Sequence, residues 1–408
     1  MSRAHRAAPA GTPRPLPYGQ HSIDETDIAA VVAVLRSDRL AHGPVVGEFE
    51  AALAAVVGAR AGGACSSGTA ALHLALAALD VGPGDICVVP AISFLSTATA
   101  ARFCGADVVF ADVEPTTGLM TAPTLSAAIA STGGRIKAVL PVHLGGRICA
   151  MDELSQMARA AGAVIVEDAC HALGGHDAAG RTVGGCALSD AAAFSFHPVK
   201  TIAAGEGGMV TTNDLALAER VRRLANHAVT RSPDMLVDRE LSTDESGELN
   251  PWSYEQIELG YNYRMNEMEA ALGLSQLARL SRFTDRRRSL SARYDEALAS
   301  LAAVLTPVHG YPGDHVAPHL YQVRIDFPGA GVSRAALMRR LASEGIGTQV
   351  HYIPIYRQPY FRGLYGEQRL AGAEAFYDQV LALPLFPAMT DGDVDRVVDA
   401  LVRVLGMA

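Results

Sequence analysis

Short apolar runs and amphipathic segments alternate along the first half of the chain. Residues 85–90, 107–113 and 163–169 are apolar runs, and between them lie stretches whose apolar residues recur at helical spacing. Apolar strands that alternate with helices are typical of a mainly parallel sheet with helices on both faces. We therefore predict an α/β fold, in which ligands bind beyond the carboxyl ends of the strands.

The first helix is predicted over residues 22–36. Ser22 and Glu25 have the spacing of a capping box, and Ile28 and Leu35 fall on one helical face. The preceding residues 1–17 are rich in Pro, Ala and Gly, and we interpret them as a flexible tail before the fold. This stretch has arginines but no apolar region, so it does not have the pattern of a secretory signal.

The alternation ends after Asn226. Residues 231–253 are polar and acidic, which predicts an irregular excursion or a lid. Helical periodicity then returns and continues past Arg286 as a long connector. The last third has an αβ rhythm of its own, with strands expected at residues 321–327 and 347–352.

The length of the chain favours two domains that share a cleft, because 408 residues are too many for one compact core. The change of pattern predicts a large domain over residues 18–275 and a smaller C-terminal α/β domain over residues 276–408.

Charge and cysteine content limit the possible partners. The formal charge is −9 without a block of Lys or Arg, which argues against nucleic acid or an anionic membrane. The six cysteines show no CxxC spacing, so we expect free thiols in a reducing cytoplasm, without a metal site or a disulfide framework. No apolar run has the length of a membrane span, and we expect a cytoplasmic protein that acts on a small molecule.

A lysine stands between two apolar strands in the stretch FSFHPVKTIAAGEGGM, residues 194–209. Most lysines carry their amine to the surface, and Lys200 could do the same. The alternative is a desolvated amine that attacks a carbonyl group and holds a cofactor as a Schiff base. The stretch alone leaves both interpretations open.

Two further motifs lie where predicted strands end. SSGTAAL, residues 66–72, leads from small residues into a helix whose first N–H groups suit a phosphate, although an ordinary serine cap has the same pattern. AVIVEDACHA ends a buried strand with Glu167 and Asp168, which could serve a ligand or cap the next turn. Neighbouring side chains of a strand point to opposite faces, and we favour Asp168 as the one that faces a site.

A phosphate seat, a carboxylate and a reactive lysine are the three anchors that pyridoxal phosphate (PLP) needs. From Tyr18 to its end, the chain resembles the DegT/StrS-type sugar aminotransferases, which are fold-type I PLP enzymes. The resemblance is carried by SSGTAAL, EDACHALGG, FSFHPVK with GEGGM behind it, and LGYNYRMNEMEAALG. PYGQHSID, VHYIPIYRQPYF and LALPLFP look most like the branch that aminates a UDP-4-keto-6-deoxy-N-acetylhexosamine in pseudaminic acid synthesis.

The resemblance implies a role for each matching residue. Lys200 would hold the PLP aldehyde and, once displaced, carry a proton between the donor Cα and the cofactor. Asp168 would pair with the pyridine nitrogen, Phe94 would stack on the ring, and His171, where a glutamine is more usual in the wider family, would also contact the cofactor. The residues expected to hold the phosphate are Gly68, Thr69, Ser195 and, from the partner subunit of a homodimer, Asn262. The residues expected to contact the sugar nucleotide are Tyr18, Asp38, Arg39, Leu40, Ala41, Gly68, Ser195, Asn262, His351, Tyr352, Ile353 and Pro354.

The implied reaction has two halves. Glutamate, expected from the resemblance alone, gives its amine to PLP, and the pyridoxamine form then aminates C4 of the UDP-linked ketosugar, with Lys200 as general base and acid. Three alternatives are weighed against this one. Related sugar 3-dehydratases have a histidine in place of the lysine, other nucleotide-sugar 4-aminotransferases differ in their substrate, and a regulator could use the same fold without catalysis. Lys200 argues against the first; His197 and Arg264 are interpreted as structural.

Overall fold

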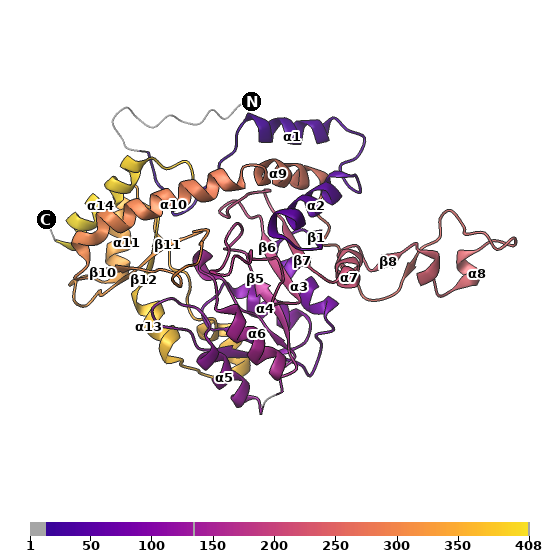
Figure 1. Cartoon of the computed structure of the whole chain (residues 1–408), viewed down its shortest axis with the longest axis horizontal. Coiled ribbons are helices and arrows are strands. Elements are labelled where there is room, and N and C mark those ends of the chain that lie inside the picture. The colour runs from indigo at the N-terminus through magenta and orange to yellow at the C-terminus, as the bar shows by residue number, and fades with distance from the viewer. Residues whose placement is uncertain (1–13, 134, 407–408) are drawn as a thin grey trace.

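The computed structural model describes residues 14–133 and 135–406, and its centre is a seven-stranded sheet (Figure 1). The strands lie in the order β1-β7-β6-β5-β4-β2-β3. β7 is antiparallel to both of its neighbours, whereas the other neighbouring pairs are parallel. The predicted α/β fold with a mainly parallel sheet is confirmed. The strands are β1 (Ala61–Cys65), β2 (Ile86–Pro90), β3 (Asp107–Ala111), β4 (Ala138–Val139), β5 (Val164–Asp168), β6 (Ala191–Ser195) and β7 (Gly208–Thr212).

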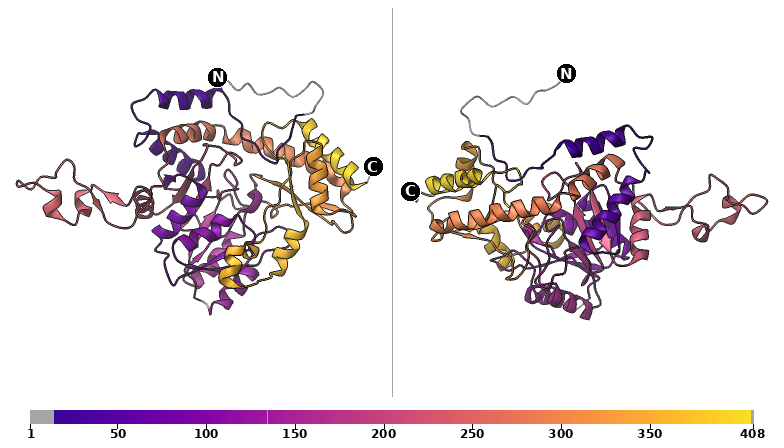
Figure 2. Two further views of the ribbon diagram at one scale, coloured as in Figure 1. Left: turned by 180° about the vertical axis from the view of Figure 1, so that it is seen from behind. Right: turned by 45° about the horizontal axis from the view of Figure 1, so that its top comes forward.

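Side chains of this sheet alternate between two apolar cores. In β6, Ala191 and Ala193 belong to the core on one face, and Ala192 and Phe194 belong to the core on the other. A strand that is buried on both faces requires this period of two. Helices cover both faces (Figures 1 and 2). They are α2 (Val45–Val57), α3 (Gly68–Ala78), α4 (Leu95–Phe103), α5 (Ala122–Ser131), α6 (Met151–Ala160), α7 (Leu215–Ala225) and α9 (Glu267–Leu277), with a 3-10 turn η1 (Leu144–Gly146). Helix α1 (Glu25–Leu35) packs on α9, outside this layer.

A further core surrounds a three-stranded antiparallel sheet near the C-terminus, and we refer to this part as the small domain. Helix α10 (Leu280–Ala297) leads into it, so the predicted connector past Arg286 is confirmed (Figure 1). The remaining elements are β10 (Leu305–Pro307), β11 (Tyr321–Ile325), β12 (Val380–Leu383), α11 (Arg334–Ser343), α12 (Pro359–Tyr365), α13 (Ala371–Gln379), α14 (Asp391–Leu405), η3 (Leu298–Leu301) and η4 (Ile355–Arg357).

The N-terminal contacts begin earlier than Tyr18. Leu16 is fully buried in the small-domain core, its N–H donates to the carbonyl of Gly345 at 2.8 Å, and its carbonyl accepts from the N–H of Gly347 at 2.7 Å. The last part of the predicted tail therefore packs against the fold, while its residues 1–13 lie outside the described residues.

The capping box of α1 is formed by other residues than Ser22 and Glu25, and that prediction is wrong. Asp24 caps the helix, and the side chain of Asp27 closes the box. Both pairs have the required spacing, but the carboxylate of Asp27 is fully buried and pairs with Arg279 at the start of α10. The two candidate capping boxes have the same spacing, and the buried ion pair between Asp27 and Arg279 favours the one that contains Asp27.

Residues 347–352 do not form the predicted strand. They bridge the small sheet only at Gln349, opposite Ala382. Of the three strands of that sheet only β11 was predicted, and β10 and β12 were missed. Strand β1 was also missed, because its sequence AGGAC lacks the β-branched and aromatic residues that mark strands.

Residues 229–258 form an arm that projects beyond α7 (Figures 1 and 2). Its short elements are η2 (Pro233–Met235), α8 (Arg239–Ser242) and the hairpin of β8 (Val229–Thr230) with β9 (Glu255–Gln256). The side chains of Val237, Leu241 and Trp252 on this arm are exposed. Among the helices that the structure describes, none is long and apolar enough to cross a membrane.

Candidate active site

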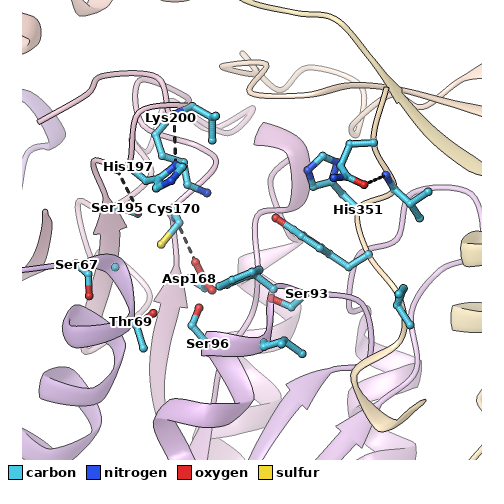
Figure 3. Close-up of a pocket in the computed structure, with 18 of the residues that line it drawn as sticks. Ser67, Thr69, Ser93, Ser96, Asp168, Cys170, Ser195, His197, Lys200 and His351 are labelled. Atoms are coloured by element: carbon cyan, nitrogen blue, oxygen red, sulfur yellow. Dashed lines mark hydrogen bonds between the residues drawn. The ribbon is translucent and has the colours of Figure 1, made fainter. Parts of the chain in front are cut away.

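A cavity of about 500 Å³ opens at the carboxyl ends of the parallel strands, between the large sheet and the small domain (Figure 3). Ser67 follows β1, Ser93 follows β2, Asp168 ends β5 and Ser195 ends β6, and all four line the cavity. The carboxyl ends of parallel strands meet at one edge of a sheet, so the loops behind them face one space. The predicted site residues that line this cavity are Tyr18, Gly68, Thr69, Phe94, Asp168, Ser195, Lys200, His351, Tyr352 and Ile353.

The start of α3 forms a seat for an anion at one end of the cavity. Ser67 caps the helix, and its Oγ accepts a hydrogen bond from the N–H of Ala70 at 3.1 Å. The N–H groups of Gly68 and Thr69 have no carbonyl within the helix to bind, and the helix dipole adds partial positive charge there. A Cβ at Gly68 would lie 2.6 Å from the Cβ of Ser195, so only glycine leaves the seat open. These residues fit a phosphate group.

Asp168 presents a buried carboxylate to the cavity from the last position of β5. Its Oδ2 accepts a hydrogen bond from Thr97 Oγ1 at 2.7 Å, and its Oδ1 accepts one from the N–H of Cys170 at 3.2 Å. Because Thr97 donates to Asp168, it accepts from Ser93 Oγ, 2.6 Å away. This chain of donors orients the carboxylate, and its remaining lone pairs can bind a protonated ring nitrogen.

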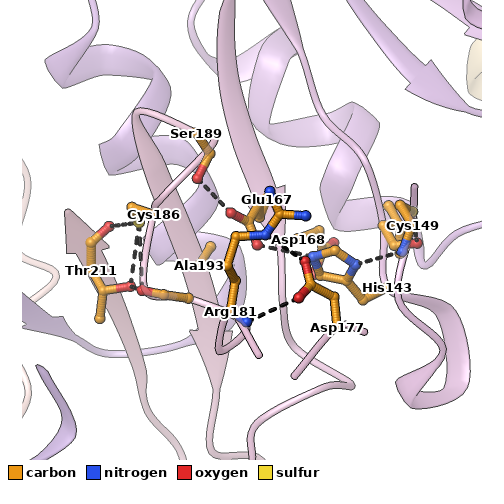
Figure 4. A network of polar contacts seen from close by, with 12 residues as sticks. His143, Cys149, Glu167, Asp168, Asp177, Arg181, Cys186, Ser189, Ala193 and Thr211 are labelled. Atoms are coloured by element: carbon orange, nitrogen blue, oxygen red, sulfur yellow. Dashed lines mark hydrogen bonds and ion pairs between the residues drawn. The ribbon is translucent and has the colours of Figure 1, made fainter. Parts of the chain in front are cut away.

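Glu167, the neighbour of Asp168, points to the opposite face of the sheet (Figure 4). Its carboxylate lies 2.9 Å from Nε2 of His143 and accepts a hydrogen bond from Ser189. Nδ1 of His143 accepts the N–H of Cys149 at 3.1 Å, so Nε2 is the nitrogen that donates. Strand alternation therefore separates the two carboxylates, and Glu167 serves a structural network.

Lys200 enters the cavity from the loop after β6. The backbone N–H of Phe196 donates to the carbonyl of Gly207 at 2.8 Å, which joins the two ends of the loop. Within the loop, the backbone N–H of Lys200 donates to the carbonyl of His197 at 2.8 Å. The side chain is partly buried, and burial lowers the pKa of its amine, while Cys170 and Asp168 act in the opposite direction. A lowered pKa leaves more of the amine neutral and nucleophilic.

The wall opposite the sheet is formed by residues 349–353. Its position is fixed by Gln322 on β11, whose Nε2 donates to the carbonyl of His351 at 3.0 Å. The Oε1 of Gln322 accepts from Arg147 Nη2 at 2.6 Å, and Arg147 is buried beside the large sheet. The rings of Tyr18 and His351 pack 5.3 Å apart and complete the wall.

His171 lies behind this wall and does not line the cavity. It is buried, its Nδ1 accepts the N–H of Gly145 at 3.2 Å, and its Nε2 lies 3.3 Å from the hydroxyl of Tyr352. Phe94 does line the cavity, and its ring lies 5.9 Å from that of Tyr352. His197, which we interpreted as structural, lines the cavity as well, whereas Arg264 donates to Asn226 at 2.9 Å.

Three other predicted contacts lie outside the cavity of this chain. Asn262 is exposed and bridges to Asn226. The turn of residues 38–41 is exposed. It lies next to the start of α9, where the backbone N–H of Glu267 donates to the carbonyl of Leu40 at 3.1 Å. Pro354 is buried and does not line the cavity, and the N–H of the next residue, Ile355, donates to the carbonyl of Ala91 at 2.9 Å.

Two features of the sequence also indicate this site, namely its scarcity of lysine and the position of Thr97. Only Lys137 and Lys200 are lysines among the 34 basic residues Lys and Arg. An arginine cannot act as a neutral nucleophile, so a lysine retained in a chain this rich in arginine is itself informative. Thr97 was also missed, although it lies one helical turn after Phe94 and so faces the same side of α4.

A metal site is not part of this cavity. Among residues 14–133 and 135–406, no group of three or more His, Cys, Asp or Glu side chains is arranged to hold a metal ion.

The sequence pattern of the DegT/DnrJ/EryC1/StrS aminotransferase family matches residues 21–402. The chain is 38 % identical over 389 residues to the spore coat polysaccharide biosynthesis protein SpsC of Bacillus subtilis, and the match covers 95 % of this chain and 96 % of SpsC.

Solved structures share the fold over nearly their whole length. Helicobacter pylori PseC, an aminotransferase involved in the biosynthesis of pseudoaminic acid, has a TM-score of 0.87 at 26 % identity, covering 97 % of this chain and 100 % of PseC. The putative sugar aminotransferase Spr1654 of Streptococcus pneumoniae in its PMP form has a TM-score of 0.85 at 28 % identity, covering 96 % and 99 %, and it has also been solved in the PLP form. Because the family pattern spans most of the chain and the cavity offers PLP a fitting phosphate seat, carboxylate and amine, this protein is a PLP-dependent sugar aminotransferase of the DegT/DnrJ/EryC1/StrS family.

Proposed function

We propose that this enzyme moves the amino group of glutamate to C4 of a UDP-linked 4-keto-6-deoxy-N-acetylhexosamine, as in pseudaminic acid synthesis. The observation that carries the proposal is that Lys200 and Asp168 face one cavity, and that residues 350–353 of its opposite wall belong to the motif VHYIPIYRQPYF. The structural likeness to PseC, an aminotransferase involved in the biosynthesis of pseudoaminic acid, supports a role in the same kind of pathway.

When bound, PLP supplies an aldehyde that accepts an amino group and a ring that withdraws electrons. In the proposal, the phosphate is held by the N–H groups of Gly68 and Thr69 and by the hydroxyl of Ser195. The carboxylate of Asp168 keeps a proton on the ring nitrogen, and the Thr97 hydroxyl holds that carboxylate in place. A protonated nitrogen makes the ring a better acceptor of electrons, which is what removal of the donor's Cα proton requires.

Lys200 is the proposed base and acid of both half-reactions. In the first half-reaction its amine takes the proton from Cα of the amino acid and gives it to the cofactor carbon that receives the amino group. In the second it takes a proton from that carbon and gives it to C4 of the sugar. Burial lowers the pKa of this amine, and a general base works best when its pKa lies near the working pH.

The sugar nucleotide is proposed to bind between the sheet and the wall. Tyr18, His351, Tyr352 and Ile353 offer aromatic and polar groups on that side. A partly exposed wall that combines apolar side chains with polar groups suits a sugar ring, since its faces are apolar and its hydroxyls are polar.

We also propose a homodimer whose partner subunit completes each site. Asn262, predicted to bind the phosphate, is exposed and stands outside the cavity of its own chain, as does the turn of residues 38–41. Mixing Lys200→Ala chains with Asn262→Ala chains should restore part of the activity, because one site of each mixed dimer then keeps both residues. Failure to recover activity after verified subunit exchange would contradict the shared site.

The substrate is tested by incubating the PLP-loaded enzyme and glutamate with a panel of UDP- and dTDP-linked 4-ketosugars. The products are read by mass spectrometry for replacement of the ketone oxygen by an amine, and by NMR for the configuration at C4. The proposal expects the UDP-4-keto-6-deoxy-N-acetylhexosamine to have the highest kcat/KM. A higher value for another ketosugar would support the second candidate, a 4-aminotransferase of another nucleotide-sugar pathway. The 38 % identity to SpsC, a spore coat polysaccharide biosynthesis protein, favours this second candidate.

A further inference from the structure

We propose that Tyr352 donates a hydrogen bond to an oxygen atom of the molecule bound in the cavity, and that His171 acts through Tyr352 by fixing the direction of that bond. The inference rests on the proposed function in one respect, namely that PLP and a sugar nucleotide occupy this cavity. It changes the expected role of His171 from a cofactor contact to a positioning residue.

The first step is the tautomer of His171. The N–H of Gly145 donates to Nδ1 at 3.2 Å, so Nδ1 is an acceptor and carries no proton. A neutral imidazole then has its proton on Nε2. Burial and the nearby cations Lys200 and Arg147 hold the pKa of this ring well below its usual range, so it is neutral in the working range of pH.

The backbone enforces this arrangement. Gly145 has a φ of +68°, and a Cβ there would lie 2.9 Å from Arg147 Nη1 and from Gln322 Oε1. The N–H that fixes the tautomer therefore comes from a position that favours glycine. On its other side, the ring of His171 packs 4.4 Å from that of His319, which prevents it from turning.

The second step follows from the distance of 3.3 Å between Nε2 of His171 and the hydroxyl of Tyr352. Since Nε2 carries the proton, the oxygen of Tyr352 is the acceptor in this contact. The hydroxyl keeps its own proton, because burial raises the pKa of Tyr352 well above its usual value. That proton is then directed away from His171, towards the cavity that Tyr352 lines.

The partner of this proton is an acceptor oxygen on a bound molecule. The two sources in the proposed reaction are the phenolic oxygen on the PLP ring and an oxygen of the sugar. Both accept a hydrogen bond from a fixed hydroxyl, and a bond to an ionised oxygen is the stronger of the two. Spectra of the enzyme with PLP alone separate the two sources, because no sugar is then present.

A matched set of variants tests the inference. Tyr352→Phe keeps the ring and removes the donor, His171→Leu removes the orienting group, and His171→Gln can again accept from Gly145 and donate to Tyr352. Tyr321→Phe is the control, because its hydroxyl binds Asp295 in the small domain at 2.7 Å and lies outside the cavity. Thermal melting checks that each variant folds.

The first readout is the visible absorbance of the PLP-loaded protein as a function of pH, without substrates. A donor to the ring oxygen favours the deprotonated chromophore, so Tyr352→Phe should move the transition about one unit to higher pH, the equivalent of one net hydrogen bond. His171→Leu should move it in the same direction by less, and His171→Gln and Tyr321→Phe should leave it unchanged. Other groups near the pair are present in every variant, so the difference reports the hydrogen bond; they are Tyr18, Asp168, Cys170, Lys200, Arg147, His319 and His351.

The second readout is KM for the sugar nucleotide. If the transition does not move but KM rises about tenfold in Tyr352→Phe and not in the control, the acceptor is on the sugar. If neither changes, the inference is wrong, although the proposed function stands as long as the wild type binds PLP and transfers amine. A wild type that shows no visible band with PLP would overturn the proposed function and this inference together.

Discussion

The two sides of the cavity are built in different ways. We call Gly68, Asp168, Ser195 and Lys200 the cavity floor, and residues 349–353 with Tyr18 the cavity wall. Each floor residue ends a strand of the large sheet or lies in the segment that follows one. The wall has no strand of its own. It is held by an isolated backbone bridge between Gln349 and Ala382 and by the side chain of Gln322.

This difference separates chemistry from specificity. Hydrogen-bonded strands fix the floor to one geometry, as the transfer of a proton by Lys200 requires. The wall can change its side chains without disturbing the sheet, so the proposed function assigns the choice of sugar to the wall. The predictions below test this division, from the largest expected effect to the smallest.

Lys200→Ala should abolish the reaction. We expect turnover to fall at least about 10³-fold, because both half-reactions lose their base and their acid. The measurement is steady-state kinetics. Lys137→Ala is the matched control, because Lys137 precedes β4 and so lies at the amino end of a strand, whereas the cavity lies at the carboxyl ends. Full activity in Lys200→Ala would remove the lysine from the mechanism.

The two neighbouring carboxylates should behave in opposite ways. Asp168→Ala should slow the reaction of the PLP form with glutamate about 10²-fold, because the ring nitrogen loses its partner. Glu167→Gln should leave that rate unchanged and lower the free energy of unfolding by about 1–3 kcal/mol, because buried His143 and Ser189 lose a charged acceptor. Stopped-flow absorbance and urea unfolding measure the two effects, and a rate loss in Glu167→Gln would contradict the separation by strand alternation.

Gly68→Ala should weaken PLP binding about tenfold or more. The added methyl group would lie 2.6 Å from Cβ of Ser195, so the seat must shift or close. Gly363→Ala in α12 is the control, because a Cβ there has no neighbour within 4 Å. The dissociation constant of PLP is measured by titration of the apo protein, and equal affinities in the two variants would place the phosphate elsewhere.

Gln322→Leu should weaken binding of the sugar nucleotide at the wall without changing the reaction with glutamate. His351 loses the bond that positions its carbonyl, and we expect KM for the sugar nucleotide to rise about tenfold while the reaction with glutamate keeps its rate. Buried Arg147 also loses a partner, which should lower the free energy of unfolding by about 1–3 kcal/mol. A slower reaction with glutamate would show that the floor and the wall are not independent.

The sequence predicted the floor better than the wall for the same structural reason. Asp168 could be placed because an apolar run ends beside it, and strand alternation selected it over Glu167. Residues 347–352 read as a strand, but their backbone is bridged to the sheet only at Gln349. A wall held by one isolated bridge and by a side chain from a distant segment leaves no local pattern to read.

Contacts between distant segments account for the other differences. Asp24 and Asp27 formed the capping box in place of Ser22 and Glu25, because Asp27 pairs with Arg279. His171 was expected at the cofactor, yet it lies behind Tyr352, a relation between two residues 181 positions apart. Local spacing carries no information about such pairs.

The most direct test of the account is to load the protein with PLP, reduce it with borohydride, and locate the cofactor by peptide mass spectrometry. Reduction makes the bond between a lysine and PLP permanent, and the chain offers only Lys137 and Lys200. The account predicts labelling of Lys200 and not of Lys137, and its loss when glutamate is added before the reduction. Label on Lys137, or no label in a protein that transfers amine, would contradict the cavity floor proposed here.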